Sequence, residues 1–240
     1  MKTIFYDVDT QNDFMNENGA LYVPGAENIK KNLATLTLKA VKESTLILGS
    51  VDLHYGTEEY KSREGELQRH GGPFPDHCMA NTDGVKKISE TNNVHNLAHM
   101  YIPHFLPNDK KTISESSLEL LIYEFLGKHV YKYVGETLVP KNNSTGAILF
   151  AKQSYDVTSN PYFNFVIGLI KPEKAIVYGV ATDYCVKAAV EGLLKHNIEV
   201  HVVTDAIKGI SEENSAKLLL EWKTQGVTLV TTRDVVKNNV

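Results

Sequence analysis

Ala175-Ile-Val-Tyr-Gly-Val-Ala-Thr-Asp-Tyr-Cys185 is typical of a buried strand that turns into a helix. The first four residues are apolar, and Gly179 lets the chain turn. Apolar residues then recur at helical spacing, at Val186, Ala189, Val190, Leu193 and Leu194. With Thr182 as the expected N-cap, Cys185 falls in the first helical turn, where free N–H groups and the helix dipole favour the thiolate. Such a cysteine is either a nucleophile or a small core residue.

The composition is that of an ordinary globular protein, with 42% hydrophobic and 22% charged residues in 240. This length allows one large α/β domain or a domain with an insertion. A formal charge of −4 gives no reason to expect nucleic acid or an anionic membrane as partner. Cys78 and Cys185 cannot form a disulfide framework, and no signal peptide or membrane-length apolar run is evident. We therefore expect a cytoplasmic protein, in which a free thiol persists.

Predicted strands and helices alternate along most of the chain. The expected strands are 3–8, 45–51, 147–151, 175–178, 200–204 and 227–230. The expected helices are 27–42, 161–169, 183–195 and 211–224. This alternation predicts an α/β fold: a doubly wound, mainly parallel six-stranded sheet with helices on both faces.

Residues 90–146 interrupt the alternation. They contain a helix of their own, with a possible capping box at Ser116 and Glu119, and a possible extra strand at 130–134. No linker flanks them. We interpret them as an insertion or lid within a single domain of residues 1–240.

Polar residues follow several of the predicted strands at their C-terminal ends, the edge where open α/β sheets bind ligands. Asp9, Asp52 and Lys152 lie there, together with the turn before Cys185. Asp9 has the chemistry of a general base and Cys185 that of a nucleophile. Lys152 would supply the positive charge that keeps both ionised. Taken singly, the aspartate is equally explained as a turn residue and the lysine as a solvated side chain.

Four motifs in this chain resemble those of the isochorismatase-like cysteine hydrolases, which include nicotinamidases and N-carbamoylsarcosine amidases. Asp9-Thr-Gln-Asn-Asp-Phe14 resembles their D-x-Q-x-D-F opening, and Gly179-Val-Ala-Thr-Asp-Tyr-Cys-Val186 their nucleophile motif. Phe150-Ala-Lys152 is similar to their lysine strand. Phe74-Pro-Asp-His-Cys78 is similar to the aromatic-Pro-x-His-Cys segment of nicotinamidases.

The resemblance implies a mechanism. Asp9 takes the thiol proton, and Cys185 attacks an amide carbonyl. Backbone N–H groups of Ala181 and Cys185 hold the oxyanion, next to a cis Val180–Ala181 peptide. Ammonia leaves and water hydrolyses the thioester. Phe14 and Phe74 would form a slot for a flat ring, although each is also a plausible core aromatic.

A metal site is the second implication. Asp52 and His54 are two residues apart, so on an extended chain they point the same way. With His77 they match three ligands that nicotinamidases use for a divalent metal. A carboxylate with imidazoles suits zinc first, with iron or manganese as alternatives. The fourth family ligand, a histidine, is absent, and Tyr60 stands near its spacing. The expected substitutes are Glu64 or His70, with Glu58 and Glu59 also possible. Alternatively, both histidines only hydrogen-bond loop backbone.

The favoured interpretation is a nicotinamidase-like hydrolase that acts on a small planar amide. A related hydrolase of a carbamoyl or ureido compound is the alternative within the family, because the tract 155–161 departs from the nicotinamidase pattern. A non-catalytic binding protein of the same fold is the third possibility. The resemblance also implies a homo-oligomer, with a small-molecule substrate as its other partner.

Overall fold

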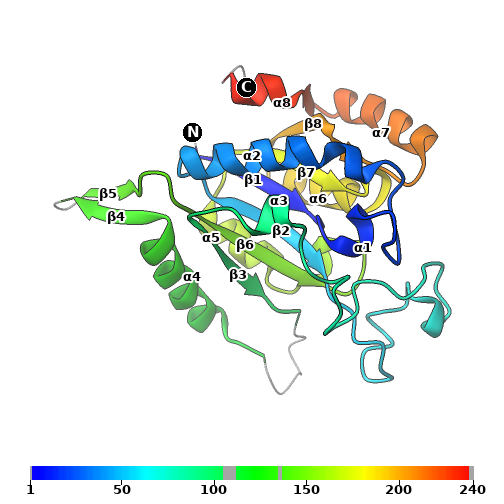
Figure 1. The fold of residues 1–240 in the computed structure, drawn as a ribbon. Coiled ribbons are helices and arrows are strands. Elements are labelled where there is room, and N and C mark those ends of the chain that lie inside the picture. The colour runs from blue at the N-terminus through cyan, green and yellow to red at the C-terminus, as the bar shows by residue number, and fades with distance from the viewer. Residues whose placement is uncertain (1, 105–111, 135–136, 238–240) are drawn as a thin grey trace.

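The computed structural model describes residues 2–104, 112–134 and 137–237. A seven-stranded sheet runs through its centre, and every neighbouring pair of its strands is parallel (Figure 1). From one edge to the other, the order is β3 (Leu97–Ile102), β6 (Thr145–Lys152), β2 (Ile47–Asp52), β1 (Thr3–Val8), β7 (Lys174–Val180), β8 (Glu199–Lys208) and β9 (Thr228–Val230).

The interior strands are continuous apolar runs because the sheet is covered on both faces. Every residue of β2, β6 and β7 is buried, which is the pattern of parallel strands between two helical layers. The predicted doubly wound α/β fold is confirmed. The expected number of six strands is wrong, since β3 pairs with β6 and extends the sheet by one strand at its edge.

Helices cover the two faces and form two apolar cores. One core contains residues of α2 (Lys30–Lys42) and α8 (Thr232–Val236). The other contains residues of α4 (Glu115–His129), α5 (Phe163–Ile170), α6 (Lys187–Lys195) and α7 (Glu212–Thr224). Shorter helices are α1 (Asn12–Met15) and α3 (Ser89–Asn92). No helix among the described residues is long and apolar enough to cross a membrane.

The segment 90–146 is built into this fold. It supplies β3 to the sheet, and α4 buries Leu118, Ile122 and Leu126 in one of the two cores. The predicted extra strand is present as β4 (Tyr131–Val134), which pairs with β5 (Thr137–Pro140) in an antiparallel hairpin away from the main sheet (Figure 1). The expected capping box is wrong. Ser114 caps α4 instead, its hydroxyl accepting a hydrogen bond from the Ser117 N–H at 3.2 Å.

Candidate active site

The turn between β7 and the following helix positions Cys185. Gly179 has φ +121°, and a Cβ there would overlap the carbonyl oxygen of Val8 on the neighbouring strand. The Val180–Ala181 peptide is cis, as the resemblance implied. Residues Thr182–Val186 then form a π-helical turn that continues as α6.

One expectation about this turn is corrected. Ala181 is the N-cap residue in place of Thr182, and its carbonyl accepts hydrogen bonds from the N–H groups of Tyr184 and Val186. The Asp183 carboxylate accepts hydrogen bonds from the N–H groups of Ile210 and Ser211, both at 2.9 Å. The nucleophile turn is therefore tied to the start of α7.

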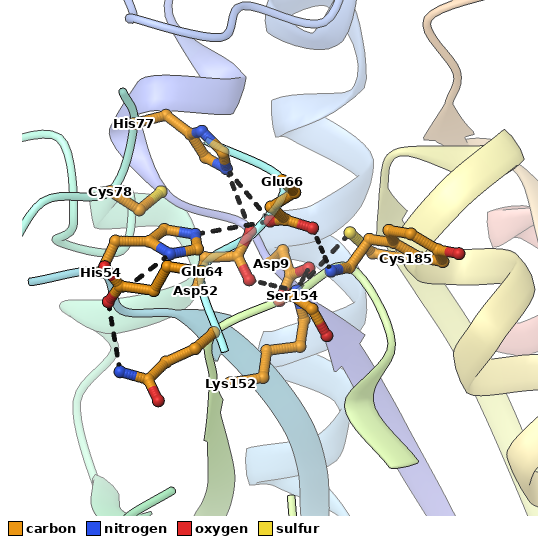
Figure 2. A network of polar contacts seen from close by, with 12 residues as sticks. Asp9, Asp52, His54, Glu64, Glu66, His77, Cys78, Lys152, Ser154 and Cys185 are labelled. Carbon is orange, nitrogen blue, oxygen red and sulfur yellow. Dashed lines mark hydrogen bonds and ion pairs between the residues drawn. The ribbon is translucent and has the colours of Figure 1, made fainter. Parts of the chain in front are cut away.

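Asp9, Lys152 and Cys185 come together at the C-terminal edge of the sheet (Figure 2). The Lys152 ammonium lies 2.9 Å from the Asp9 carboxylate and 3.6 Å from the sulfur of Cys185. It also forms an ion pair with Asp52, its register partner on β2. Asp9 and Lys152 are wholly buried, and Cys185 is 6% exposed. A carboxylate oxygen of Asp9 lies within 4.8 Å of the sulfur.

Burial and Lys152 act in opposite directions on the pKa values of Asp9 and Cys185. Burial raises the pKa of the Cys185 thiol well above its usual value, although Lys152 opposes the shift. Burial also raises the pKa of Asp9, again against Lys152. Both shifts disfavour the ionised forms and Lys152 favours them, so the expectation that Lys152 keeps Asp9 and Cys185 ionised stays a prediction. An ionised Asp9 beside a protonated thiol is the arrangement that general-base activation requires.

A group of carboxylates and imidazoles lies next to the cysteine (Figure 2). Asp52, His54, Glu66 and His77 each offer one ligand atom, and these atoms lie within 4.8 Å of one another. The Nε2 atom of His77 is 3.5 Å from Asp52, and Nε2 of His54 is 3.5 Å from Glu66. The pKa of Asp52 lies below its usual range: burial alone would raise it, but Lys152 and His77 outweigh that effect.

The fourth member of this group is Glu66. From the sequence, Glu64 or His70 is predicted for this position and Glu66 is not. Glu64 lies outside this group and accepts hydrogen bonds from the N–H groups of Tyr55 and Gly56 at 2.6 and 2.7 Å. His70 lies beside Glu64, with 3.8 Å between Nε2 and the carboxylate. This loop consists of turns with no repeating direction, so sequence spacing carries no signal for which carboxylate faces inward.

A small cavity of about 20 Å³ opens above the sulfur. It is lined by Phe14, Leu21, Val23, Asp52, Glu66, Phe74, His77, Tyr155, Ala181, Tyr184, Cys185 and Ile210. Phe14 and Phe74, both named from the sequence, lie in this wall. Tyr184 meets Phe74 edge-on at 5.4 Å between ring centroids, and Tyr155 meets Tyr184 at 5.9 Å. Within the described part of the chain, the lining includes no Lys or Arg and nothing from the segment 90–146.

Two kinds of similarity relate this chain to known proteins. Residues 129–234 match the family model of the isochorismatase domain. The nicotinamidase/pyrazinamidase of Mycobacterium tuberculosis is 23% identical over 223 residues, which make up 93% of this chain and 95% of that protein. The chain is therefore similar to isochorismatase-like proteins in its second half by the family model, and to a nicotinamidase over most of its length. It is also 25% identical over 240 residues to the nicotinamidase of Escherichia coli, covering 95% of this chain and 93% of that protein.

The isochorismatase-like fold is also evident from solved structures. Pyrazinamidase of Pyrococcus horikoshii, solved in complex with zinc, superposes with a TM-score of 0.65 and 24% identity over 96% of this chain and 99% of that chain. The segment matched by the family model includes Lys152 and Cys185. Asp9 and the Asp52–His77 loop precede it, so their roles depend on the geometry described above.

Proposed function

We propose that this chain is a cysteine-dependent hydrolase that converts a small amide to a carboxylate and ammonia. The observation that carries the proposal is the buried contact of Lys152 with both Asp9 and the sulfur of Cys185. Relatives of this chain that carry the names nicotinamidase and pyrazinamidase support the same reaction class.

In the proposed mechanism Asp9 is the general base and Cys185 the nucleophile. The Asp9 carboxylate takes the thiol proton while the Cys185 sulfur bonds to the amide carbonyl carbon. Backbone N–H groups of Ala181 and Cys185 would hold the tetrahedral oxyanion. The proton on Asp9 passes to the nitrogen as the C–N bond breaks, releasing ammonia and leaving a thioester. Asp9 then takes a proton from water, which attacks the thioester and returns the thiol.

Lys152 serves this sequence as a fixed charge. Its ammonium touches Asp9 and the sulfur, so it favours the negative charge that moves between them. Because its pKa is raised well above the usual value by Asp52 and Asp9, against the effect of burial, it stays protonated throughout. We therefore assign Lys152 electrostatic stabilisation and assign proton transfer to Asp9.

The cavity lining favours a small, flat substrate. Aromatic side chains form much of its wall, among them Phe14, Phe74 and Tyr184. A planar ring can pack against such side chains. This favours small ring amides such as nicotinamide or pyrazinamide over carbamoyl compounds that carry no ring.

A divalent metal fits the neighbouring group. Two carboxylates and two imidazoles suit zinc, and both ring nitrogens of buried His54 lack a hydrogen-bond partner. We propose Asp52, His54, Glu66 and His77 as the residues that would hold it. When bound, such an ion would supply a Lewis acid beside the cavity, able to accept a ring nitrogen of the substrate.

The test is ammonia release from nicotinamide, pyrazinamide and N-carbamoyl amino acids. We expect turnover of the two ring amides, little of the carbamoyl compounds, and loss of turnover in Cys185→Ala. The matched control is Cys78→Ala, since Cys78 is also buried but absent from the cavity lining. Appreciable turnover by Cys185→Ala, or no ammonia from any amide, would refute the proposal.

A further inference from the structure

Glu64 is a buried carboxylate outside the catalytic machinery. Its side chain is 0% exposed. Besides the two backbone N–H groups of Tyr55 and Gly56, it accepts a hydrogen bond from the side-chain amide of Gln153 at 3.2 Å. These donors hold the carboxyl group in one orientation. Its position beside the ligand group places it against one of the ligands.

It faces His54. The Nδ1 atom of His54 lies 4.0 Å from Glu64, and on the other side of the ring Nε2 lies 3.5 Å from Glu66. The imidazole is thus placed between two carboxylates, of which only Glu66 belongs to the ligand group. If Nε2 binds a metal, the single ring proton must sit on Nδ1, directed toward Glu64.

We infer that Glu64 is a positioning residue for the metal site. Its negative charge favours the Nδ1–H tautomer of His54, which leaves the Nε2 lone pair free for the ion and fixes the plane of the ring. Carboxylates in this position raise the basicity of the ligating nitrogen. The inference rests on the proposed metal site and adds to it a residue outside the ligand set.

His70 provides a matched comparison. Its Nε2 atom is 3.8 Å from the same carboxylate, about as far as His54, yet His70 is absent from the ligand group. Replacing His70 removes an imidazole beside Glu64 without touching His54. Replacing Gln153 loosens the support of Glu64 while its charge remains.

The experiment measures Zn²⁺ affinity by chelator competition for the wild type, Glu64→Gln, His70→Asn and Gln153→Ala. A ¹H–¹⁵N spectrum of zinc-loaded, histidine-labelled protein reads the Nδ1–H proton of His54 directly. We expect Glu64→Gln to weaken Zn²⁺ binding on the order of 10–100-fold and to speed exchange of that proton. His70→Asn should retain both wild-type values, and Gln153→Ala, in which the Glu64 carboxyl group remains, should change them less than Glu64→Gln does.

The results distinguish failure of the proposed metal site from failure of the positioning role of Glu64. A wild-type protein that does not bind Zn²⁺ overturns the metal site and, with it, the role of Glu64. Wild-type binding with unchanged affinity in Glu64→Gln overturns the positioning role alone. Equal losses in Glu64→Gln and Gln153→Ala, with the His54 proton unaltered, would show that Glu64 only supports the loop.

Discussion

Lys152 meets three groups at once: the carboxylates of Asp9 and Asp52 and the sulfur of Cys185. Its ammonium therefore neutralises charge both in the catalytic group, Asp9 and Cys185, and in the adjoining ligand group, through Asp52. Removing it would leave two buried carboxylates without their ammonium, and an uncompensated buried charge is among the most destabilising changes in a protein.

We expect Lys152→Met to lower the free energy of unfolding by about 3–5 kcal/mol and to abolish turnover. Urea denaturation followed by circular dichroism measures the first effect, and ammonia release the second. The control is Lys217→Met, which removes an exposed lysine paired with Glu213 on one helix and should change stability by less than about 0.5 kcal/mol. Comparable stability of the two variants would contradict the network.

Asp9 should be visible in the pH dependence of the reaction. Only its carboxylate form can accept the thiol proton, and burial raises its pKa above the ordinary value. As the pH falls through this raised pKa, Asp9 is protonated and kcat/KM should fall. We expect the acid limb of the kcat/KM profile above the usual aspartate range near pH 3.9. A limb at or below that range would argue against Asp9 as the base.

The roles of Asp9 and Lys152 could be proposed from sequence because both end predicted strands and both sit in recognisable motifs. Their protonation could not, since it depends on burial and on charges brought from distant strands. The importance of Glu66 was hidden for a different reason. It lies in a turn-rich loop where neither helical nor strand periodicity fixes the direction of a side chain.

At the scale of elements, the turn after β7 depends on close approach of two backbones. Gly179 lies against the Val8 carbonyl of β1, and its φ of +121° is one that side chains rarely allow. Gly179 is therefore needed both for the pairing of β7 with β1 and for the turn that leads to Cys185.

Gly179→Ala should force β1 and β7 apart, at a cost of about 1–3 kcal/mol or more, and should reduce turnover because Cys185 shifts from Asp9. The control is Gly168→Ala in α5, where a Cβ meets nothing within 4 Å. This substitution should stabilise by about 0.5–1 kcal/mol, because alanine is the better helix former. Denaturant unfolding of both proteins measures these opposite signs. A Gly179→Ala protein of wild-type stability and activity would contradict the close approach.

Most elements were predictable because each is a long apolar run or a clear helical period. β3 was missed since Leu97–Ile102 is an edge strand with mainly half-buried residues, including His99, and so lacks the buried run of its neighbours. The start of α4 was misplaced because three serines, at 114, 116 and 117, offer competing caps.

At the scale of the whole molecule, the segment 90–146 and the remainder of the chain share one apolar core. Ile122 of α4 is fully buried in the cluster that also holds Phe150 and Val166. The segment should therefore unfold together with the sheet.

We expect Ile122→Ala to lower the free energy of unfolding by about 2–5 kcal/mol in a single transition that also reports loss of activity. Leu120, on the same helix, is 71% exposed, so Leu120→Ala should change stability by less than about 0.5 kcal/mol. Fluorescence and activity followed along one urea series test this. Separate transitions for the two probes in Ile122→Ala would mean that α4 folds apart from the sheet.

The pairing of β1 with β7 joins the beginning of the chain to its third quarter, from Thr3 with Lys174 to Val8 with Gly179. During synthesis, the first strand emerges long before the neighbour that completes it. Until that neighbour is made, β1 has an open apolar edge, and such edges recruit other chains. Contacts so distant in sequence also make folding slow. The same pairing that brings the thiol to its base thus delays catalytic competence until β7 and the turn after it have been synthesised, and makes chaperone protection valuable in the interval.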